Sequence, residues 1–191
     1  CMAKLEEALT TEKMITSMGN LFRYNLKTTE QIVPLERELK VVRDYMYIQE
    51  MRFGNRIRYD CCLEVDEATA KIPAFTLQPL VENAIVHGVG KKEQGGRVFL
   101  RVWQKGNMMI ISVADTGIGM DKEARNGLEE ALKNRHTSKV GIGLGNIYQR
   151  IHTMYQEGEM KIYSQKGRGM VIQIAIPQKA EKEQMVARES R

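Results

Sequence analysis

Hydrophobic positions follow a helical rhythm in the first part of the chain. Up to residue 53, apolar side chains recur every three or four positions, as they do in amphipathic helices. Residues 2–28 are expected to form one helix. Pro34 disfavours a helical conformation at Val33 and is well placed to begin a second helix. The two helices are expected to form an antiparallel hairpin or part of a dimeric bundle; the alternative is that they simply pack on the following domain.

After the turn signal Gly54-Asn55 the pattern changes to strands. Residues 66–75 separate the first strand from a short helix and are expected to be a connector. Glycine-containing turns join the later strands in pairs, which indicates hairpins. Five strand-like runs are expected, at residues 57–65, 98–104, 109–115, 160–165 and 170–176.

Two helical segments and one long loop complete the pattern. Leu77–Gly88 and residues 144–155 keep a helical spacing, whereas residues 116–143 are rich in glycine and charge with little apolar periodicity. A long, weakly patterned segment inside a compact domain is usually functional, and we expect a loop there.

The order of elements predicts an α+β fold. Strands outnumber helices and are mostly hairpin-linked, so we expect a two-layer α/β sandwich with a mixed, mostly antiparallel sheet, preceded by the N-terminal helical hairpin. Residues 1–54 would be the helical segment and residues 55–177 the main domain. Residues 178–191 are charged, without a strong apolar rhythm, and are expected to be a disordered tail.

Composition narrows the class of protein. The 191 residues are 42% hydrophobic and 28% charged, which is typical of a globular protein. The net charge of +5 is not concentrated in a Lys/Arg block with interleaved aromatics, so nucleic-acid binding is not expected. No apolar run approaches the roughly 20 residues of a membrane span, and no signal peptide is evident. Cys1, Cys61 and Cys62 suggest neither a disulfide framework nor a metal site, and a reducing, cytosolic setting fits them best.

The segment Val81–Gly88, reading VENAIVHG, carries the first candidate chemistry. Asn83 and His87 are four positions apart and would share one face of a helix, with Glu82 at its edge. An amide oxygen at Asn83 suits Mg²⁺ that is also bound by phosphate. Glu82 is a candidate base, and His87 could meet phosphate charge. Asn83 or His87 alone would more often be a satisfied polar residue of a helix than a ligand.

The segment Asp115–Met120, reading DTGIGM, follows a strand directly. An ionised carboxylate at Asp115 only accepts hydrogen bonds, which suits an exocyclic amine such as that of adenine. Gly117 and Gly119 lack side chains, so a flat ring can approach the backbone there. Taken alone, this pattern also matches many turns and some calcium loops.

The segment Gly141–Asn146, reading GIGLGN, opens a helix. Backbone N–H groups at glycines 141, 143 and 145, together with the helix dipole, would form an anion site suited to phosphates. Because this segment does not follow an expected strand, it argues against a dinucleotide-binding fingerprint.

Together, in this order, the three segments resemble the N, G1 and G2 boxes of the GHKL ATPases, which include gyrase, chaperone, histidine kinase and mismatch-repair proteins. Three upstream segments resemble the LytS/YesM-like sensor histidine kinases: Val33–Leu39, Tyr47–Phe53 and Ile72–Ile85. The resemblance covers roughly residues 14–177. It implies the Bergerat ATP-binding fold, with ATP and Mg²⁺ as ligands.

The resemblance also implies roles for individual residues. Asn83 would bind Mg²⁺, Glu82 would be the catalytic acid/base residue, and His87 would line the phosphate side. Asp115 would hold the adenine amine, with Gly117 and Gly119 beside it. Residues 121–140 would be an ATP lid. The residues expected to close on the phosphates are Gly141, Gly143 and Leu144.

The chain departs from the family pattern in three ways. The family's phosphoacceptor histidine precedes the helices seen here, and the only histidines of this chain are His87, His136 and His152. We therefore expect the catalytic part of a larger kinase that phosphorylates a histidine outside this chain and passes the phosphoryl group to a response regulator. Thr116 replaces a usual asparagine, and Met170 a usual threonine near the adenine.

The full-length kinase is expected to be a homodimer, attached to the membrane only through N-terminal segments outside this chain. Two alternatives remain open. One is another GHKL ATPase or serine kinase, which the upstream helical segment disfavours. The other is a non-catalytic nucleotide-binding or dimerisation scaffold; Glu82, Asn83 and Asp115 argue against it, whereas Met170 leaves it room.

Overall fold

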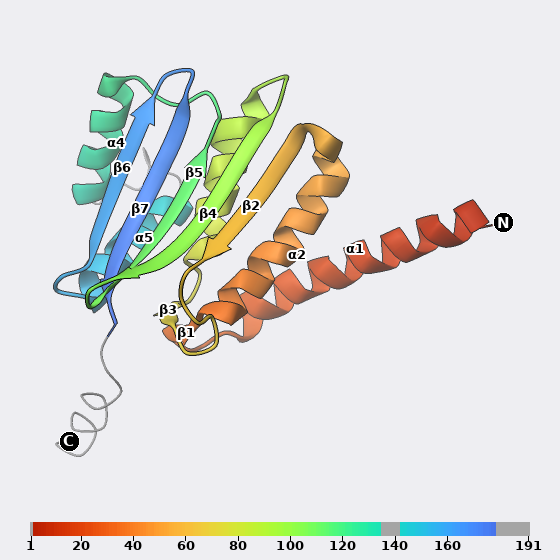
Figure 1. Cartoon of the computed structure of the whole chain (residues 1–191), viewed down its shortest axis with the longest axis horizontal. Coiled ribbons are helices and arrows are strands. Elements are labelled where there is room, and N and C mark those ends of the chain that lie inside the picture. The colour runs from red at the N-terminus through yellow and green to blue at the C-terminus, as the bar shows by residue number, and fades with distance from the viewer. Residues whose placement is uncertain (1, 135–141, 179–191) are drawn as a thin grey trace, which may run out of the picture.

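A computed structural model describes residues 2–134 and 142–178 of the chain (Figure 1). The helices are α1 (Met2–Lys27), α2 (Leu35–Phe53), α3 (Leu77–Asn83), α4 (Lys122–Lys133) and α5 (Ile142–Met154), with short helical turns η1 (Gly54–Arg56), η2 (Ala84–Gly88) and η3 (Val89–Lys91). The strands are β1 (Ile32–Pro34), β2 (Ile57–Leu63), β3 (Lys71–Pro73), β4 (Gly96–Lys105), β5 (Met108–Asp115), β6 (Glu159–Gln165) and β7 (Gly169–Pro177).

Five strands form the main sheet, in the order β2-β4-β5-β7-β6. Only β2 and β4 run parallel, and the other neighbours are antiparallel. Side chains of β5 alternate between partly exposed and buried along the whole strand, because successive residues of a strand point to opposite faces. The predicted mixed, mostly antiparallel sheet is confirmed.

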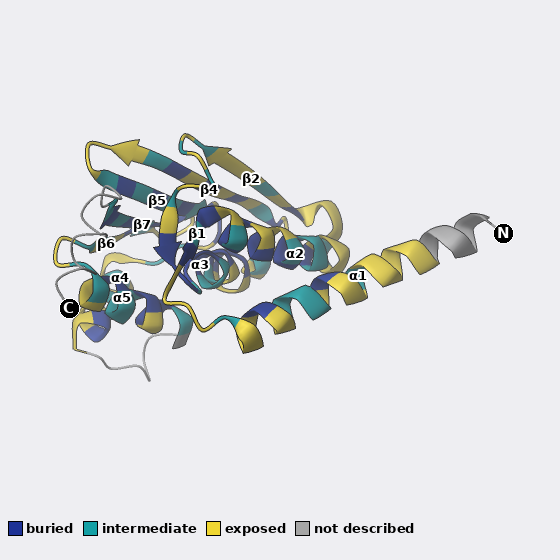
Figure 2. Ribbon diagram, turned by 90° about the horizontal axis from the view of Figure 1, so that it is seen from below, coloured by how far each residue is buried: buried dark blue, intermediate teal, exposed yellow. Residues whose placement is uncertain are grey.

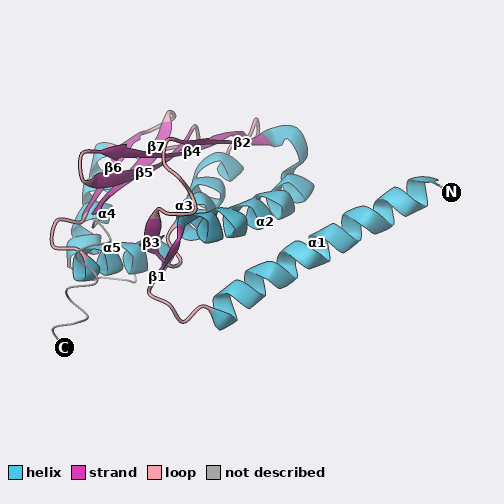
Figure 3. Cartoon of the chain, turned by 60° about the horizontal axis from the view of Figure 1, so that its bottom comes forward, coloured by secondary structure: helices cyan, strands magenta, loops and turns pink. Residues whose placement is uncertain are grey.

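The helices cover one face of this sheet, which gives two layers (Figure 3). Helix α3 lies in the centre of the helical layer, and much of its ribbon is coloured as buried (Figure 2). Four residues from different elements are fully buried in one hydrophobic core: Leu80 of α3, Ile85 of η2, Ile111 of β5 and Ile151 of α5. The predicted α+β sandwich is therefore confirmed.

The two N-terminal helices run antiparallel, as expected, but differ in their burial (Figures 2 and 3). Helix α2 contributes Leu35, Leu39 and Val42 to the same core as the sheet. Helix α1 touches α2 and then extends away, and its Phe22 and Leu26 are 62% and 82% exposed. The division of the chain at residue 54 stays a prediction, as does a role of these helices in a dimer.

One helix was not expected. The prediction of a continuous loop over residues 116–143 is wrong for α4, which begins where the Asp121 side chain accepts a hydrogen bond from the Ala124 N–H at 2.9 Å. Asp121 is a favourable N-cap residue, and Leu128 and Leu132 lie on the helix face that meets the core. The expected lid over residues 121–140 thus contains α4, and part of it lies outside the described residues.

A small second sheet was also missed. Strand β1 pairs antiparallel with β3, so part of the expected connector 66–75 is a strand. Val33 is extended, as predicted, but Pro34 is also extended at the end of β1, and α2 begins one residue later, at Leu35. Nearly all of the expected tail lies outside the described residues. Within the described part of the chain, every helix is too short or too polar to cross a bilayer.

Candidate functional site

The helical segment 77–88 lies at the centre of the site and changes its geometry midway. It is α-helical to Asn83 and becomes a π turn over η2, whereas the sequence had predicted one regular helix. A π turn closes on the fifth residue instead of the fourth. The four-residue spacing of Asn83 and His87 therefore does not stack them as an α-helix would. Such turns occur frequently at functional sites.

The polar residues of this segment have different surroundings. Asn83 is partly buried, and its side-chain nitrogen is buried without a hydrogen-bond partner among the described residues. Glu82 and His87 are exposed. Burial raises the pKa of the Tyr45 hydroxyl on α2, and the charge of Glu82 raises it further, so Glu82 lies near α2.

Asp115 ends strand β5 beneath this segment and is only 6% exposed. Its Oδ1 accepts a hydrogen bond from the Gly117 N–H at 2.7 Å, and the Met170 N–H donates to the same carboxylate. Burial raises the pKa of Asp115 above the ordinary 3.8, although these N–H groups and the charge of Lys92 oppose the rise. A carboxylate offers about four acceptor positions, so Asp115 keeps acceptor capacity after these two bonds.

Two glycines meet directly over Asp115. A Cβ atom at Gly88 would lie 2.6 Å from Asp115 Oδ1, and one at Gly117 would lie 2.2 Å from the Gly88 carbonyl carbon. Neither position can carry a side chain without displacing the other or the carboxylate. The end of η2 and the turn after β5 thus approach backbone to backbone, directly against the Asp115 carboxylate.

The turn after β5 is fixed by contacts from three sides. Lys92 Nζ donates to the Thr116 carbonyl at 2.6 Å. Thr116 Oγ1 accepts the Arg97 N–H at 2.9 Å, which extends the pairing of β4 and β5 by one residue. Gly119 has φ +58, and a Cβ atom there would lie 2.1 Å from the Gln165 carbonyl oxygen, so glycine is required for both conformation and space. The threonine that replaces the family's asparagine has a structural role here.

The start of α5 lies against the central helix. A Cβ atom at Gly143 would be 3.1 Å from Cβ of Pro79 on α3, and Leu144 is buried in the core. Gly141 lies outside the described residues. The structure therefore brings Gly143 and Leu144 next to α3, and their expected contacts with phosphates stay predictions.

Of the expected site residues, Asp115 and Gly117 are in contact with each other. Gly88 touches both Asp115 and Gly117, and Asn83 lies five positions before Gly88. Sequence reasoning missed Gly88 and Lys92 as site residues. Gly88 is the last residue of the first motif, and it must be glycine for reasons of space, because a Cβ atom there would meet the Asp115 carboxylate. For Lys92, no signal distinguished it from its neighbour Lys91.

The polar side chains near Asn83 fit a magnesium ion that is bound jointly by the protein and a nucleotide better than they fit a metal ion bound by protein side chains alone. The described residues contain no group of three or more His, Cys, Asp or Glu side chains that could hold an ion. Magnesium is commonly bound by one or two protein oxygens plus phosphates and water. The Asn83 amide oxygen is a ligand of this kind, and the amide nitrogen, which is buried without a partner among the described residues, is a donor suited to a phosphate oxygen.

The chain matches two known families and several known proteins. The histidine kinase family matches residues 1–57, and the family of histidine kinase-, DNA gyrase B- and HSP90-like ATPases matches residues 72–180. The sensor protein LytS of Bacillus cereus is 32% identical over 98% of this chain and 32% of its own length. The sensor histidine kinase YesM of Bacillus subtilis is 32% identical over 92% of this chain and 29% of its own length. The chain thus spans about a third of these relatives.

A solved structure shares the fold at low identity. The histidine kinase domain of the blue-light activated histidine kinase from Erythrobacter litoralis EL346 has a TM-score of 0.56, 16% identity, and covers 92% of this chain and 82% of that one. The ATPase match spans more than half of the chain. The chain is similar to LytS- and YesM-type sensor kinases and belongs to the family of histidine kinase-, DNA gyrase B- and HSP90-like ATPases.

Proposed function

We propose that the chain is the ATP-binding catalytic portion of a sensor histidine kinase, which transfers the γ-phosphoryl group of ATP to a histidine outside this chain and thence to a response regulator. The observation that carries this proposal is the buried carboxylate of Asp115, which retains acceptor capacity beneath two glycines in contact. A buried polar group is normally satisfied by hydrogen bonds, so the remaining positions suit a ligand donor.

The adenine end of the substrate would be recognised by Asp115. Its carboxylate would accept from the exocyclic amine, and the close packing of Gly88 and Gly117 places two backbone segments directly beside that carboxylate. Met170 supplies a backbone N–H to Asp115, as any residue except proline would, but its side chain lacks the hydroxyl of the threonine that is usual in the family. The scaffold alternative therefore keeps the room that Met170 leaves it.

The phosphate end would be met by Asn83, His87 and the first turn of α5 with Gly143. Bound Mg²⁺ would neutralise phosphate charge there, with the Asn83 amide as its protein ligand. Glu82 is exposed beside Asn83 and would accept a hydrogen bond from the attacking imidazole. Phosphoryl transfer depends mainly on positioning and charge stabilisation, which this set of residues supplies.

We propose the partners and the cellular location of the full-length protein from its similarity to LytS and YesM. The names of LytS and YesM describe them as sensor proteins. We infer a response regulator as the phosphoryl acceptor of the full-length kinase, which would act as a homodimer and reach the membrane through segments outside this chain.

The test is phosphohistidine formation. The chain, extended N-terminally to include the acceptor histidine, is incubated with γ-labelled ATP, and acid-labile label on the protein is measured. Labelling that disappears in the Glu82→Gln variant supports the proposal. Good ATP binding without any labelling would favour the scaffold, and acid-stable labelling of serine would favour a serine kinase.

A further inference from the structure

A second carboxylate, Glu38 of α2, is completely buried and lies at the opposite end of α3 from Asp115. One of its oxygens accepts the Phe75 N–H at 2.8 Å and the Tyr24 hydroxyl; the other accepts the Thr76 N–H at 2.9 Å and the Leu77 N–H at 2.8 Å. Four donors fill the roughly four acceptor positions of a carboxylate. Glu38 is therefore saturated and has no capacity for a ligand.

These donors lie at the start of α3. The first N–H groups of a helix have no partner within it and form its positive end. The side chain of Thr76, the residue before α3, does not cap the helix, and its hydroxyl donates to the Pro73 carbonyl at 2.7 Å instead. The cap comes from another helix, 38 residues earlier. Glu38 thereby fixes the start of α3 relative to α2.

Phe75, two residues before α3, has a strained backbone conformation. Phe75 has φ +59, the only positive value of a non-glycine residue in the described chain, and a left-handed conformation is unfavourable for a bulky side chain. Its ring lies 5.1 Å from the ring of Tyr24 and 5.8 Å from the Arg150 guanidinium. Strained residues persist where their surroundings hold them, often at functional sites.

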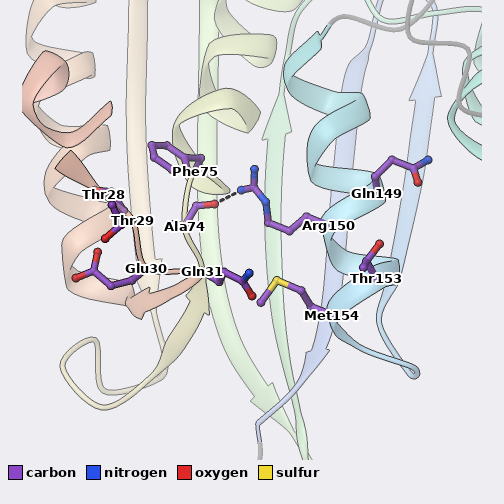
Figure 4. A pocket seen from close by; sticks show the side chains of 10 residues that line it. All are labelled: Thr28, Thr29, Glu30, Gln31, Ala74, Phe75, Gln149, Arg150, Thr153 and Met154. Carbon is purple, nitrogen blue, oxygen red and sulfur yellow. Dashed lines mark hydrogen bonds between the residues drawn. The ribbon is translucent and has the colours of Figure 1, made fainter. Parts of the chain in front are cut away.

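Arg150 holds the same loop from α5. Its guanidinium donates to the Ala74 carbonyl, at the wall of a cavity of about 490 Å³ (Figure 4). The opposite wall of this cavity is the linker that follows α1, from Thr28 to Gln31. The loop before α3 is therefore held directly by α1, α2 and α5.

The segment 77–88 is consequently fixed at both ends. Glu38 holds its first residues, and Gly88 is packed against Gly117 at its last. Asn83 lies six residues after Leu77, or about 9 Å along the helix axis. A displacement of the helix start would be transmitted to Glu82 and Asn83, because a single short helix connects them.

We propose that Glu38 is a positioning residue for the ATP-binding helix, and that the Tyr24 hydroxyl couples its hold on α3 to the position of helix α1. The proposal rests on the proposed function, since it assigns Glu82 and Asn83 to the phosphate end. Loss of the Tyr24 hydrogen bond leaves Glu38 with three backbone donors and lets the start of α3 shift. The adenine end at Asp115 stays in place, because the sheet and Gly88 hold it.

The experiment compares Tyr24→Phe with Asn20→Ala in the 191-residue chain. Phenylalanine keeps the ring contact with Phe75 and removes only the hydroxyl. Asn20→Ala removes a different hydrogen bond between α1 and α2, the one from Asn20 Nδ2 to Asp44 Oδ2 at 3.1 Å, without touching Glu38. Affinities for Mg²⁺-ATP and for adenosine are measured by NMR titration, and amide hydrogen exchange is followed over residues 80–85.

Tyr24→Phe is expected to lower the ratio of Mg²⁺-ATP to adenosine affinity about fivefold and to speed exchange over residues 80–85, whereas Asn20→Ala leaves both unchanged. A purely structural role of Tyr24 would leave the ratio at its wild-type value, and that result overturns the proposal. Equal changes in both variants would also overturn it. Wild-type chain that binds neither ligand would contradict the proposed function itself, which is a distinct outcome.

Discussion

Two carboxylates buried at opposite ends of one helical segment differ in how many donors they hold. Glu38 is fully buried and accepts four hydrogen bonds at the start of α3. Asp115 is almost as buried, at the end of η2, but accepts two backbone N–H groups. The saturated carboxylate stabilises the fold, whereas the unsaturated one is available to a ligand.

The comparison shows that burial alone does not distinguish a structural acid from a binding acid. Both side chains come from regular elements, and both contact backbone N–H groups. The number of acceptor positions left over is what separates them. The following predictions test this difference, from the largest expected effect to the smallest.

Glu38→Gln is expected to lower the free energy of unfolding by about 4 kcal/mol, because the amide nitrogen would face two buried donors that lose their acceptor. Chemical denaturation followed by circular dichroism measures the loss. Glu50→Gln, an exposed position on the same helix, is the matched control and should stay within about 0.5 kcal/mol of wild type. A loss at Glu38 no larger than the control's would show that the four-donor arrangement contributes little.

Asp115→Asn is expected to weaken ATP binding by about 10- to 100-fold, because the adenine amine loses its ionised acceptor. Isothermal titration calorimetry measures the affinity. Asp60→Asn, an exposed aspartate of β2, is the control and should bind ATP as wild type does. Unchanged affinity in Asp115→Asn would remove Asp115 from the adenine site.

Gly88→Ala is expected to weaken ATP binding about tenfold, since the added methyl group would lie 2.6 Å from Asp115 Oδ1 and must displace it. Gly19→Ala on α1 meets nothing within 4 Å and should raise the stability by about 0.5 to 1 kcal/mol through the higher helix propensity of alanine. Calorimetry and thermal denaturation give the two quantities. If the Gly88→Ala variant binds ATP as tightly as wild type does, the close contact between Gly88 and Gly117 is not required for ATP binding.

The smallest effect concerns pH. Because burial raises the pKa of Asp115 in the folded state, its protonated form is favoured there. The stability linked to this group is therefore fully present below the ordinary pKa of 3.8 and is lost as pH rises through the raised folded value. Ligand-free Asp115→Asn should melt above wild type at neutral pH, and the gap should narrow as the pH falls toward 3.8. If the difference in melting temperature between the variant and wild type widens as the pH falls, the pKa of Asp115 is not raised in the folded state.

Much of the fold could be predicted because the core strands and helices carry clear periodicity. Helix α4 was missed although Leu128 and Leu132 had helical spacing, since its remaining positions are polar and the glycines nearby suggested a loop. Strands β1 and β3 have three residues each, which is too short to show an alternating pattern of apolar and polar residues.

The site was predicted less completely than the fold. Asp115 and Gly117 are in contact because they are two residues apart in one turn, whereas the role of Asn83 stays a prediction. The cap on α3 by Glu38 joins residues 38 positions apart, and no local pattern reports such a contact. The π turn at η2 likewise depends on tertiary packing, because the apolar spacing of 77–88 is compatible with a regular helix.

The central claim is that the free acceptor positions of Asp115 hold the exocyclic amine of adenine. The most direct test is a calorimetric comparison of ATP with inosine triphosphate, in which a carbonyl oxygen replaces that amine, in wild type and in Asp115→Asn. Wild type should prefer ATP by about 10- to 100-fold, and the variant should lose most of that preference. Equal affinity of wild type for both nucleotides, or an undiminished preference in the variant, would contradict the claim.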